Sequence, residues 1–307
     1  MRPWSQGLAW AGAAGLLLAV FAAPFLWMLA TSLTANQDLF VQAGGQAWLW
    51  PERLTWGNYV EVFTKIPMAR YLANSLFTAM VHAVIETAVA AGAAFVMTAV
   101  GGRWGRRLFW LLFAAWLIPH SFLVLPRFLV TVAWPRLLPA SEFWTATRSL
   151  DLGWGEMVLG SLLGLDSFLG IILPGCFSAT AAFLLATALR QMPRSLLESA
   201  RLDTGSAWRS FWDICLPGIR APLVVVGFMA FHGAWRSFTW PLLIASSPEM
   251  LTAPVGLMAF QNLYQTQWSL LMAGGVVLTL PSLLLLFIAH RHVIDQAHVY
   301  EGESDPL

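Results

Sequence analysis

The chain has 307 residues and a formal charge of +1 at pH 7, and 58% of its residues are hydrophobic while 11% are charged. A soluble globular domain carries roughly 25% charged residues, so this composition excludes a soluble domain and predicts an integral membrane protein. The small net charge also indicates that nucleic acid is not a partner. The two cysteines, Cys176 and Cys215, lie far apart, and their spacing suits neither a disulfide framework nor a metal cluster.

Six apolar stretches are long enough for a membrane-spanning helix, which needs roughly 20 residues. In chain order they are Leu8–Leu33, Leu72–Val100, Leu108–Ala133, Phe168–Leu189, Leu223–Ala245 and Trp268–Ala289. The first is longer than the apolar part of a secretory signal peptide, so we interpret it as a retained helix, with cleavage as the alternative. The sequence therefore predicts an all-α integral membrane fold with six transmembrane helices.

The connections between these stretches define the expected organisation. We expect an N-terminal transmembrane helix at 1–33, an external loop at 34–71, a core of five transmembrane helices at 72–290 and a cytoplasmic tail at 291–307. Within the core we expect an external insertion at about 134–163 and an elbow at 193–217. Arginines are more numerous in the connections on the side of the two termini, although those connections are shorter. Because positive residues are retained in the cytoplasm, we expect both termini and the elbow there.

The elbow between the fourth and fifth spans has a charged face and an apolar face. Pro193 suits the first turn of a short helix over 194–202, Gly205 allows a turn, and Ser206 is placed to cap a second helix. An apolar stripe is predicted on that second helix, formed by Trp208, Phe211, Trp212 and Cys215. The segment is predicted to be a helix-turn-helix that either rests on the bilayer surface or docks a soluble partner.

This segment resembles the coupling loop of binding-protein-dependent ABC importer permeases. The family pattern is E-A-A-x-x-x-G followed by nine residues and I-x-L-P. The residues that match it in position are Glu198, Ala200, Ile214, Leu216 and Pro217. Ser199 replaces the second-position alanine, Thr204 stands where the glycine is usual, and Gly205 follows one place later.

Further segments, taken together and in order, resemble the carbohydrate-uptake type of these importers, and in particular the second of its two permease subunits. They are Leu54–Tyr59 (LTWGNY), Asn74-Ser75, Ile118-Pro119, Leu125-Pro126, Gly164–Pro174 (GLDSFLGIILP), Trp235–Leu242 (WRSFTWPL) and Thr252–Leu257 (TAPVGL). Two features depart from the family. The segment between Pro126 and Gly164 is longer than in relatives, and the C-terminal tail is atypical.

The resemblance implies a permease subunit of an ATP-driven importer for a sugar, oligosaccharide or sugar-like solute, in a bacterial or archaeal plasma membrane. The partners it implies are a homologous second permease, two copies of a cytoplasmic ATP-binding subunit, an extracytoplasmic solute-binding protein and membrane lipid. The residues it implies for coupling to the ATPase are Glu198, Ser199, Ala200, Asp203, Gly205 and Trp208. The alternative role for Glu198 is pairing within its helix with Arg194 or Arg201.

The energy source is expected on another chain. A P-loop needs the pattern G-x-x-x-x-G-K-[ST], and Lys65, the one lysine, is not in such a pattern. We therefore expect no cofactor, metal or catalytic residue in this chain, with ATP and Mg on the partner ATPase. The closure of that ATPase would push the elbow and switch the permease pair between inward-facing and outward-facing states.

Ionisable residues inside spans are costly and usually face a bundle interior or a cavity. His82 and Glu86 are one turn apart in the second span, so they can pair, and they either link helices or contact the permeation path. His232 and Arg236 repeat this spacing in the fifth span, where relatives usually carry asparagine in place of the arginine. Its guanidinium either binds an anionic or polyhydroxyl solute or extends toward the outer surface. His120 is interpreted as a core histidine.

Two regions are external candidates for the binding protein. In the insertion, Trp134, Trp144 and Trp154 either contact it or form a lid on the bilayer, and in relatives the loop corresponding to Ser246–Gln267 faces its cleft.

Two other classes of protein suit the sequence less well. A self-contained secondary transporter would show inverted halves or a charge relay, which the spans do not display. An intramembrane enzyme would need a catalytic constellation such as Ser-His-Asp, Cys-His or H-E-x-x-H, which the sequence lacks.

Overall fold

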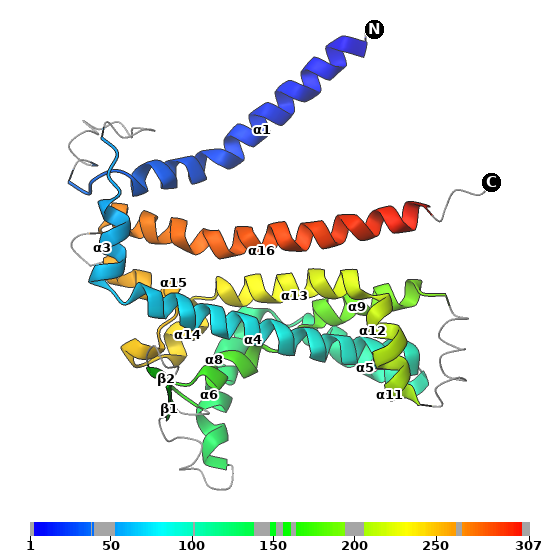
Figure 1. Cartoon of the computed structure of the whole chain (residues 1–307). Coiled ribbons are helices and arrows are strands. Elements are labelled where there is room, and N and C mark those ends of the chain that lie inside the picture. Colours follow the sequence, from blue (N-terminus) through cyan, green and yellow to red (C-terminus); the bar gives the residue numbers. More distant parts are fainter. Residues whose placement is uncertain are drawn as a thin grey trace. The chain divides into compact units, whose positions relative to one another are not determined.

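The protein is a mainly helical chain that divides into two compact units (Figure 1). A computed structural model describes residues 3–37, 39, 53–100, 102–137, 148–151, 156–160, 164–193, 206–261 and 266–302. The N-terminal unit comprises Met1–Arg70 and Gly256–Pro281, and the central unit comprises Tyr71–Val255 and Ser282–Leu307.

The N-terminal unit contains two long helices and one short one. They are α1 (Pro3–Ser32), α3 (Gly57–Lys65) and the first part of α16 (Trp268–Gly302), with a 3₁₀ turn at Leu257–Phe260. The Asn58 amide fastens the end of α1, because its Nδ2 donates to the carbonyls of Ser32 at 2.8 Å and Thr34 at 2.9 Å. The hydroxyl of Tyr59 bonds that of Ser32 at 2.8 Å. The LTWGNY segment thus anchors the chain where it leaves the first helix.

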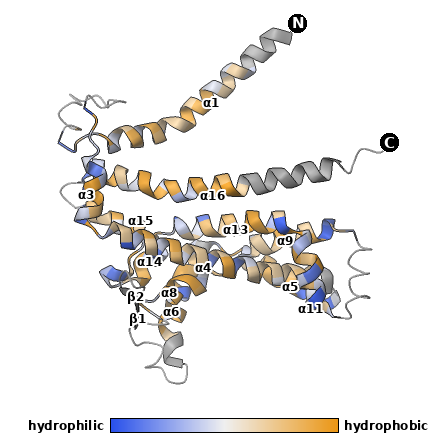
Figure 2. Cartoon of the chain, in the orientation of Figure 1, coloured by the Kyte–Doolittle hydropathy of each residue, from blue (hydrophilic) through white to orange (hydrophobic). Residues whose placement is uncertain are grey.

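Hydrophobic residues predominate along the coloured part of α1 and the first half of α16, as the orange colour in Figure 2 shows. Along the span Trp10–Ser32 only 6% of the most apolar stretch is buried inside the protein, and along Trp268–Ala289 only 11%. Such surface is unfavourable in water and favourable against lipid or another apolar helix. The helix α16 continues past the expected span, so the predicted tail at 291–307 begins as helix.

The central unit is built from many shorter helices around one long helix. In chain order its elements are α4 (Met68–Phe95), a π-helical turn (Val96–Val100), α5 (Gly102–Trp116), α6 (His120–Leu137), β1 (Arg148–Asp151), β2 (Glu156–Gly160), α8 (Phe168–Ile172), a 3₁₀ turn (Leu173–Gly175), α9 (Ala179–Gln191), α11 (Ala207–Ser210), a second π-helical turn (Phe211–Cys215), α12 (Leu216–Gly218), α13 (Arg220–Trp235), α14 (Thr239–Ile244), a 3₁₀ turn (Pro248–Met250) and α15 (Ala253–Gly256). The last part of α16 completes the unit.

Three helical segments among the described residues are long and apolar enough to cross a membrane. They are Trp10–Ser32, Met68–Thr98 and Trp268–Ala289. Three bent pairs of shorter helices meet the same criterion when each pair counts as one span. These pairs are Gly102–Trp116 with Ser121–Ala133, Phe168–Gly175 with Ala179–Gln191, and Ala207–Gly218 with Arg220–Trp235. The described helices therefore give three to six spans, and the six expected spans are reached when each bent pair is counted as one.

The third and fourth expected spans are not continuous helices. Within Leu108–Ala133, α5 and α6 are separated by a bend of 106° at Pro119, because proline lacks a helical N–H and restricts the residue before it. Within Phe168–Leu189 the helices bend by 51° after Pro174. Ser178 then starts α9 as its N-cap, with its hydroxyl accepting from the N–H of Ala181 at 3.2 Å.

The fifth expected span, Leu223–Ala245, also differs from one continuous helix. The helix α13 ends at Trp235, and α14 begins only at Thr239. A continuous helix would place the ring of Pro241 against the carbonyl of Ser237 and leave that carbonyl without its hydrogen bond. The chain instead leaves the helix for a few residues and restarts with the proline in the first turn of α14.

The expected mainly α-helical fold is confirmed, and the insertion adds one short pair of strands to it. There β1 and β2 pair antiparallel, with Ser149 opposite Val158 and Asp151 opposite Glu156, and the register shifts next to Arg148. A short segment between spans satisfies its backbone groups by pairing with itself. Met157 and Val158 sit in a stretch that favours a strand.

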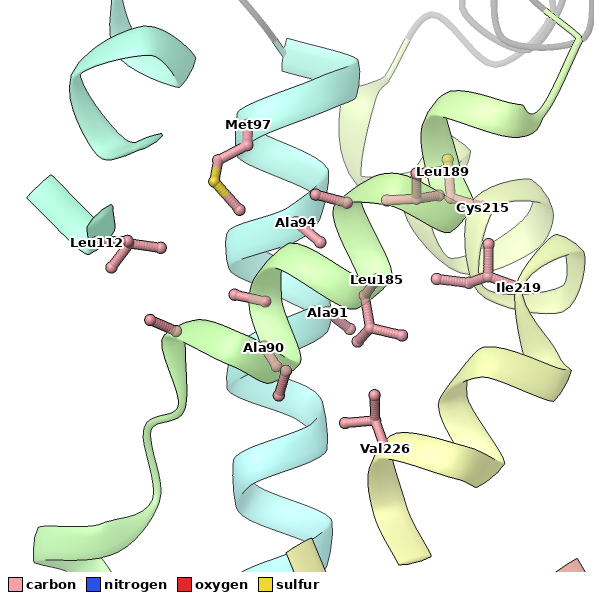
Figure 3. Close-up of a cluster of buried hydrophobic side chains, with 14 of the residues drawn as sticks. Ala90, Ala91, Ala94, Met97, Leu112, Leu185, Leu189, Cys215, Ile219 and Val226 are labelled. Atoms are coloured by element: carbon pink, nitrogen blue, oxygen red, sulfur yellow. The ribbon is translucent and has the colours of Figure 1, made fainter. Parts of the chain in front are cut away.

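The main core of the central unit lies where α4, α9 and α13 meet. Small side chains on α4, including Ala90, Ala91 and Ala94, let α9 approach closely, and Leu185 and Leu189 fill the space (Figure 3). Cys215 and Ile219, which follow α11, and Val226 of α13 complete the same cluster. The chain after the elbow is therefore part of the core of the spans.

A tight turn begins α8 and explains the GLDS motif. The backbone adopts positive φ at Gly164 (97°) and at Asp166 (55°), a region that glycine and aspartate tolerate better than most residues. The buried hydroxyl of Ser167 donates to the carbonyl of Gly164 at 2.9 Å and accepts from the N–H of Gly170 at 2.8 Å. Ser167 is therefore the N-cap of α8, and its hydroxyl also holds the turn that precedes the helix.

Gly170 is expected to tolerate no side chain, because a Cβ there would overlap the carbonyl of Gly164. We predict that Gly170→Ala destabilises the protein by about 1–3 kcal/mol, the range for overpacking. The readout is the thermal unfolding midpoint of the purified chain in detergent. Gly233→Ala on α13 is the matched control, because a Cβ there meets nothing within 4 Å. It should leave the midpoint unchanged or raised. Equal effects of the two changes would contradict the prediction.

Candidate functional site

Three motif segments meet beside the loop that follows α14. The carboxylate of Asp166 accepts hydrogen bonds from the N–H groups of Ser246 at 3.0 Å and Ser247 at 2.9 Å. The N–H of Asp166 donates in turn to the carbonyl of Ile244 at 2.8 Å. One acidic side chain therefore holds the start of this loop against the beginning of α8.

The first turns of α4 hold the other end of the same loop. Asn74 is buried, and its amide Nδ2 donates to the carbonyls of Glu249 at 2.8 Å and Leu251 at 2.9 Å. The hydroxyl of the neighbouring Ser75 accepts from the N–H of Ala253 at 2.8 Å. The asparagine–serine pair at the start of the second expected span is thus a loop anchor.

Trp240 ties α14 to the end of α8. Its indole Nε1 donates to the carbonyls of Gly170 at 3.2 Å and Ile171 at 3.1 Å. In a helix the carbonyl of Gly170 would bond the N–H of residue 174, but Pro174 has none. The indole supplies the donor that the proline lacks. We call Asn74, Ser75, Asp166, Ser167 and Trp240, with the carbonyls and N–H groups they bond, the motif junction.

An ionisable cluster lies next to this junction. The Nε2 atom of His82 lies 2.9 Å from Oε2 of Glu86, so the predicted pairing on one face of α4 is confirmed. The sulfur of Cys176 lies 3.7 Å from Nδ1 of His82 and donates to the carbonyl of Ile172 at 3.1 Å. Whether the pair contacts a permeation path stays a prediction.

Arg127 of α6 joins this cluster from another helix. Its guanidinium lies over the ring of Trp240, 4.1 Å from the ring centroid, which is a close cation–π contact. A Cβ placed on Gly175 would lie 2.7 Å from Nη2 of Arg127 and 2.8 Å from Cε1 of His82. The bare glycine therefore lets the arginine and the histidine approach the same point.

The second predicted ionisable pair is separated by the end of its helix. His232 lies in the last turn of α13, where its ring stacks on Phe228 with 6.0 Å between centroids. Its Nδ1 is buried and has no hydrogen-bond partner among the described residues. Arg236 follows the helix end and is exposed. Whether either side chain contacts the solute path stays a prediction.

The elbow is described only in its second half. Of the predicted coupling residues, Glu198, Ser199, Ala200, Asp203 and Gly205 lie outside the described residues, and so does the expected helix 194–202. Ser206 has the extended backbone of an N-cap residue directly before α11, as expected, although its hydroxyl makes no capping bond. The second helix is interrupted by the π-helical turn Phe211–Cys215, which the sequence did not predict.

The predicted apolar stripe on that helix divides into two parts. Phe211 and Cys215 are buried in the core, whereas Trp208 and Trp212 are 68% and 50% exposed. These two tryptophans line one end of an apolar cavity of about 710 Å³, whose walls come from α4, α13 and the last part of α16. The second half of the elbow therefore has exposed aromatic side chains on one face and buried side chains in the helical core on the other.

Sequence reasoning missed Arg127 as a site residue. The structure places it on α6 and against Trp240. The signal was available, because Arg127 lies inside the apolar stretch Leu108–Ala133, where a charge usually marks function. The partner of its guanidinium, far along the chain, could not be predicted.

These features together define a class of protein. Apolar helices, broken spans with internally bonded loops and an elbow rooted in the bundle are typical of a multi-pass membrane transport protein. Comparison with known families then assigns the chain. Residues 87–296 match the family described as "Binding-protein-dependent transport system inner membrane component", and the chain belongs to that family. It is a multi-pass protein of the plasma membrane.

Individual relatives confirm the predicted resemblance to carbohydrate-uptake permeases. The sn-glycerol-3-phosphate transport system permease protein UgpE of Yersinia enterocolitica is 36% identical over 44% of this chain, and the matched stretch spans about half (48%) of that relative. The arabinooligosaccharides transport system permease protein AraQ of Halalkalibacterium halodurans is 24% identical over 95% of this chain and 96% of its own length.

Solved structures share the fold. A crystal structure of a bacterial ABC transporter involved in the import of the acidic polysaccharide alginate superposes with a TM-score of 0.71. The match covers 95% of this chain and 98% of that one at 16% identity. The alginate transporter in complex with an alginate pentasaccharide-bound periplasmic protein gives a TM-score of 0.59 over 94% and 96% of the two chains, at 15% identity.

The anchoring role of Asn74 can be tested by mutation. We predict that Asn74→Ala destabilises the loop at 246–253, because two carbonyls lose their donor and an unsatisfied buried group costs about 1–3 kcal/mol. Hydrogen–deuterium exchange of the N–H groups of Met250 and Ala253 should become at least about tenfold faster.

The matched control is Asn58→Ala, which removes an amide that also bonds two carbonyls, but at the end of α1. It should leave exchange at Met250 and Ala253 unchanged. Unchanged exchange in Asn74→Ala, or equal acceleration by both changes, would refute the anchoring role.

Proposed function

We propose that this chain is a permease subunit of an ATP-driven importer for a sugar, an oligosaccharide or a sugar-like solute. The observation that carries the proposal is the family match over residues 87–296. The relatives transport a polyol phosphate and arabinooligosaccharides by name, and the structural neighbour imports alginate. All three solutes are sugars or sugar-like.

The energy source and the partners complete this proposal. ATP and Mg bind a separate cytoplasmic ATPase, present in two copies, since this sequence has no P-loop. A homologous permease completes the pathway, and an extracytoplasmic protein delivers the solute, as the periplasmic protein does in the alginate complex. Both termini lie in the cytoplasm, so the elbow faces the ATPase.

The contacts of the elbow support a coupling role. The ring of Phe211 lies 5.1 Å from that of Phe95 on α4, measured between centroids. Phe211, Cys215 and Ile219 belong to the same buried cluster as α4, α9 and α13. Because a packed core resists deformation, a force on the elbow moves the inner ends of these helices together. Closure of the ATPase pair would therefore be transmitted to the spans.

In this mechanism the helix α13 connects the elbow to the outer loop. It begins directly after the elbow, at a bend of 83°, and ends at the non-helical stretch 236–238. Beyond that stretch, α14 and the following loop are bonded to α4 and α8 at the motif junction. A tilt of α13 can thus be absorbed at 236–238 while the outer loop stays fixed, which is hinge motion between inward-facing and outward-facing states.

The coupling residues can be tested by purifying the tagged chain from its host in mild detergent and identifying its companions by mass spectrometry. We predict that an ATPase, a second permease and a solute-binding protein copurify. The variant Glu198→Gln should lower ATPase recovery by about tenfold, which corresponds to about 1.4 kcal/mol of binding energy. Glu61→Gln is the control, since Glu61 lies in the expected external loop and pairs with Lys65.

The alternative, a self-contained secondary transporter, predicts a different result. Such a chain would purify alone and move solute in liposomes without ATP, driven by an ion gradient. That outcome would overturn the importer proposal. Full ATPase recovery in Glu198→Gln would instead leave the importer in place and remove this glutamate from the contact.

A further inference from the structure

We propose that Arg127, stacked on Trp240 and facing His82, binds an anionic group of the transported solute. The solute class would then be acidic sugars, in which the group is a carboxylate or a phosphate. This inference rests on the proposed import function and specifies its solute. Its basis is the charge of Arg127, the way the guanidinium is held, and the close approach of Arg127 and His82 at Gly175.

The charge of Arg127 has no carboxylate partner in the described part of the chain. The ion pairs found there are Lys65 with Glu61 and His82 with Glu86. The Nε atom of Arg127 is buried and makes no hydrogen bond to any described residue. A cation within a membrane-spanning bundle is costly unless it is paired, so an arginine left in this state calls for an anion from outside the chain.

The acidic groups of the ionisable cluster and of the motif junction bond other partners. The carboxylate of Glu86 is directed to Nε2 of His82 at 2.9 Å. Asp166 bonds two N–H groups of the loop that follows α14. The thiol of Cys176 donates to the carbonyl of Ile172 and lies 3.7 Å from Nδ1 of His82. These three groups are therefore committed to the histidine or to the backbone.

The guanidinium is held over an aromatic ring. Trp240 lies beneath it at 4.1 Å, and two backbone carbonyls fix the indole in turn. A stacked guanidinium keeps its N–H groups at its edge, where they can bond a carboxylate or a phosphate with two parallel hydrogen bonds. Trp240 thus acts as a positioning residue, because it orients the group that would touch the solute.

The approach of Arg127 and His82 depends on Gly175. Nη2 of Arg127 and Cε1 of His82 both lie within 3 Å of the place that a Cβ on this glycine would occupy. The two side chains are therefore packed closely against the glycine. Arg127 as a whole is only half-buried, so an anion can reach it with the imidazole close by.

The first experiment measures binding without ATP. The purified Cys215→Ala chain keeps Cys176 as its one thiol, because the protein has two cysteines. The rate of its modification by methyl methanethiosulfonate is measured with glucuronate against glucose, and with sn-glycerol 3-phosphate against glycerol. We expect the acidic member of at least one pair to slow modification by at least about threefold, and its neutral counterpart to have no effect. Protection by glucuronate alone would indicate a carboxylate site, and protection by the phosphate alone a phosphate site.

The variants separate charge from structure. Arg127→Gln should abolish the protection, and Arg127→Lys should keep part of it, since lysine retains the charge but not the planar fork. Gly175→Ala keeps all charged groups, yet it should weaken the protection by displacing the guanidinium or the imidazole. Thermal unfolding of each variant reports whether it folds. Equal protection by acidic and neutral solutes, no protection by either acid, or full protection in folded Arg127→Gln would overturn the inference.

The second experiment measures ATP-dependent uptake of the same solutes by the complete importer in proteoliposomes. Preference for the acidic member, lost by roughly tenfold or more in Arg127→Gln, would support the inference, that factor being typical of a lost charged hydrogen bond. Uptake of the neutral member with no effect of Arg127→Gln would overturn the inference and leave the import function intact. Acid-specific protection of Cys176 without any ATP-dependent uptake would support the anion site and overturn the import function.

Discussion

The hydrogen bonds from the indole of Trp240 to the end of α8 determine how the rest of the central unit can be arranged. A membrane interior offers no water to free backbone groups, so each proline in a span leaves a carbonyl that the protein must satisfy itself. Pro174 leaves the carbonyl of Gly170 in this state, and Trp240, from another span, bonds it. The two broken spans must therefore stay side by side at this point. Asp166 and Asn74 add bonds to the loop that follows.

The central unit therefore has two parts. The motif junction is held by side-chain hydrogen bonds, and the region around α9 and the elbow is held by apolar packing. At the motif junction the bonds are directional, so they resist small displacements and are lost together. Around α9 and the elbow the contacts are closely packed alanine, leucine and phenylalanine surfaces, so these elements move as one body. The helix α13 belongs to the second part and is joined to the first only across 236–238. Motion is therefore expected at that boundary.

The sequence was informative where causes are local. Apolar length predicted the helical spans, and helical spacing predicted the pair of His82 and Glu86. The prolines that break three spans are visible too, but whether a proline kinks a helix or ends it depends on which distant group bonds the freed carbonyl. The same limit applies to Arg127 and Trp240, whose contact depends on how α6 and α14 pack. The strand pair arose in a segment for which apolar length gave no signal.

Arg236 and Arg127 differ in how their surroundings stabilise the charge of the guanidinium. Arg236 follows the end of α13, where the last carbonyls favour a cation, and its side chain is exposed, so its charge is stabilised in place. Arg127 is half-buried with its guanidinium over an aromatic ring, and a ring face compensates only part of the hydration that a guanidinium gives up. Sequence position suggested the first as the solute contact. The balance of solvation favours the second, because only there does a bound anion restore what folding removed.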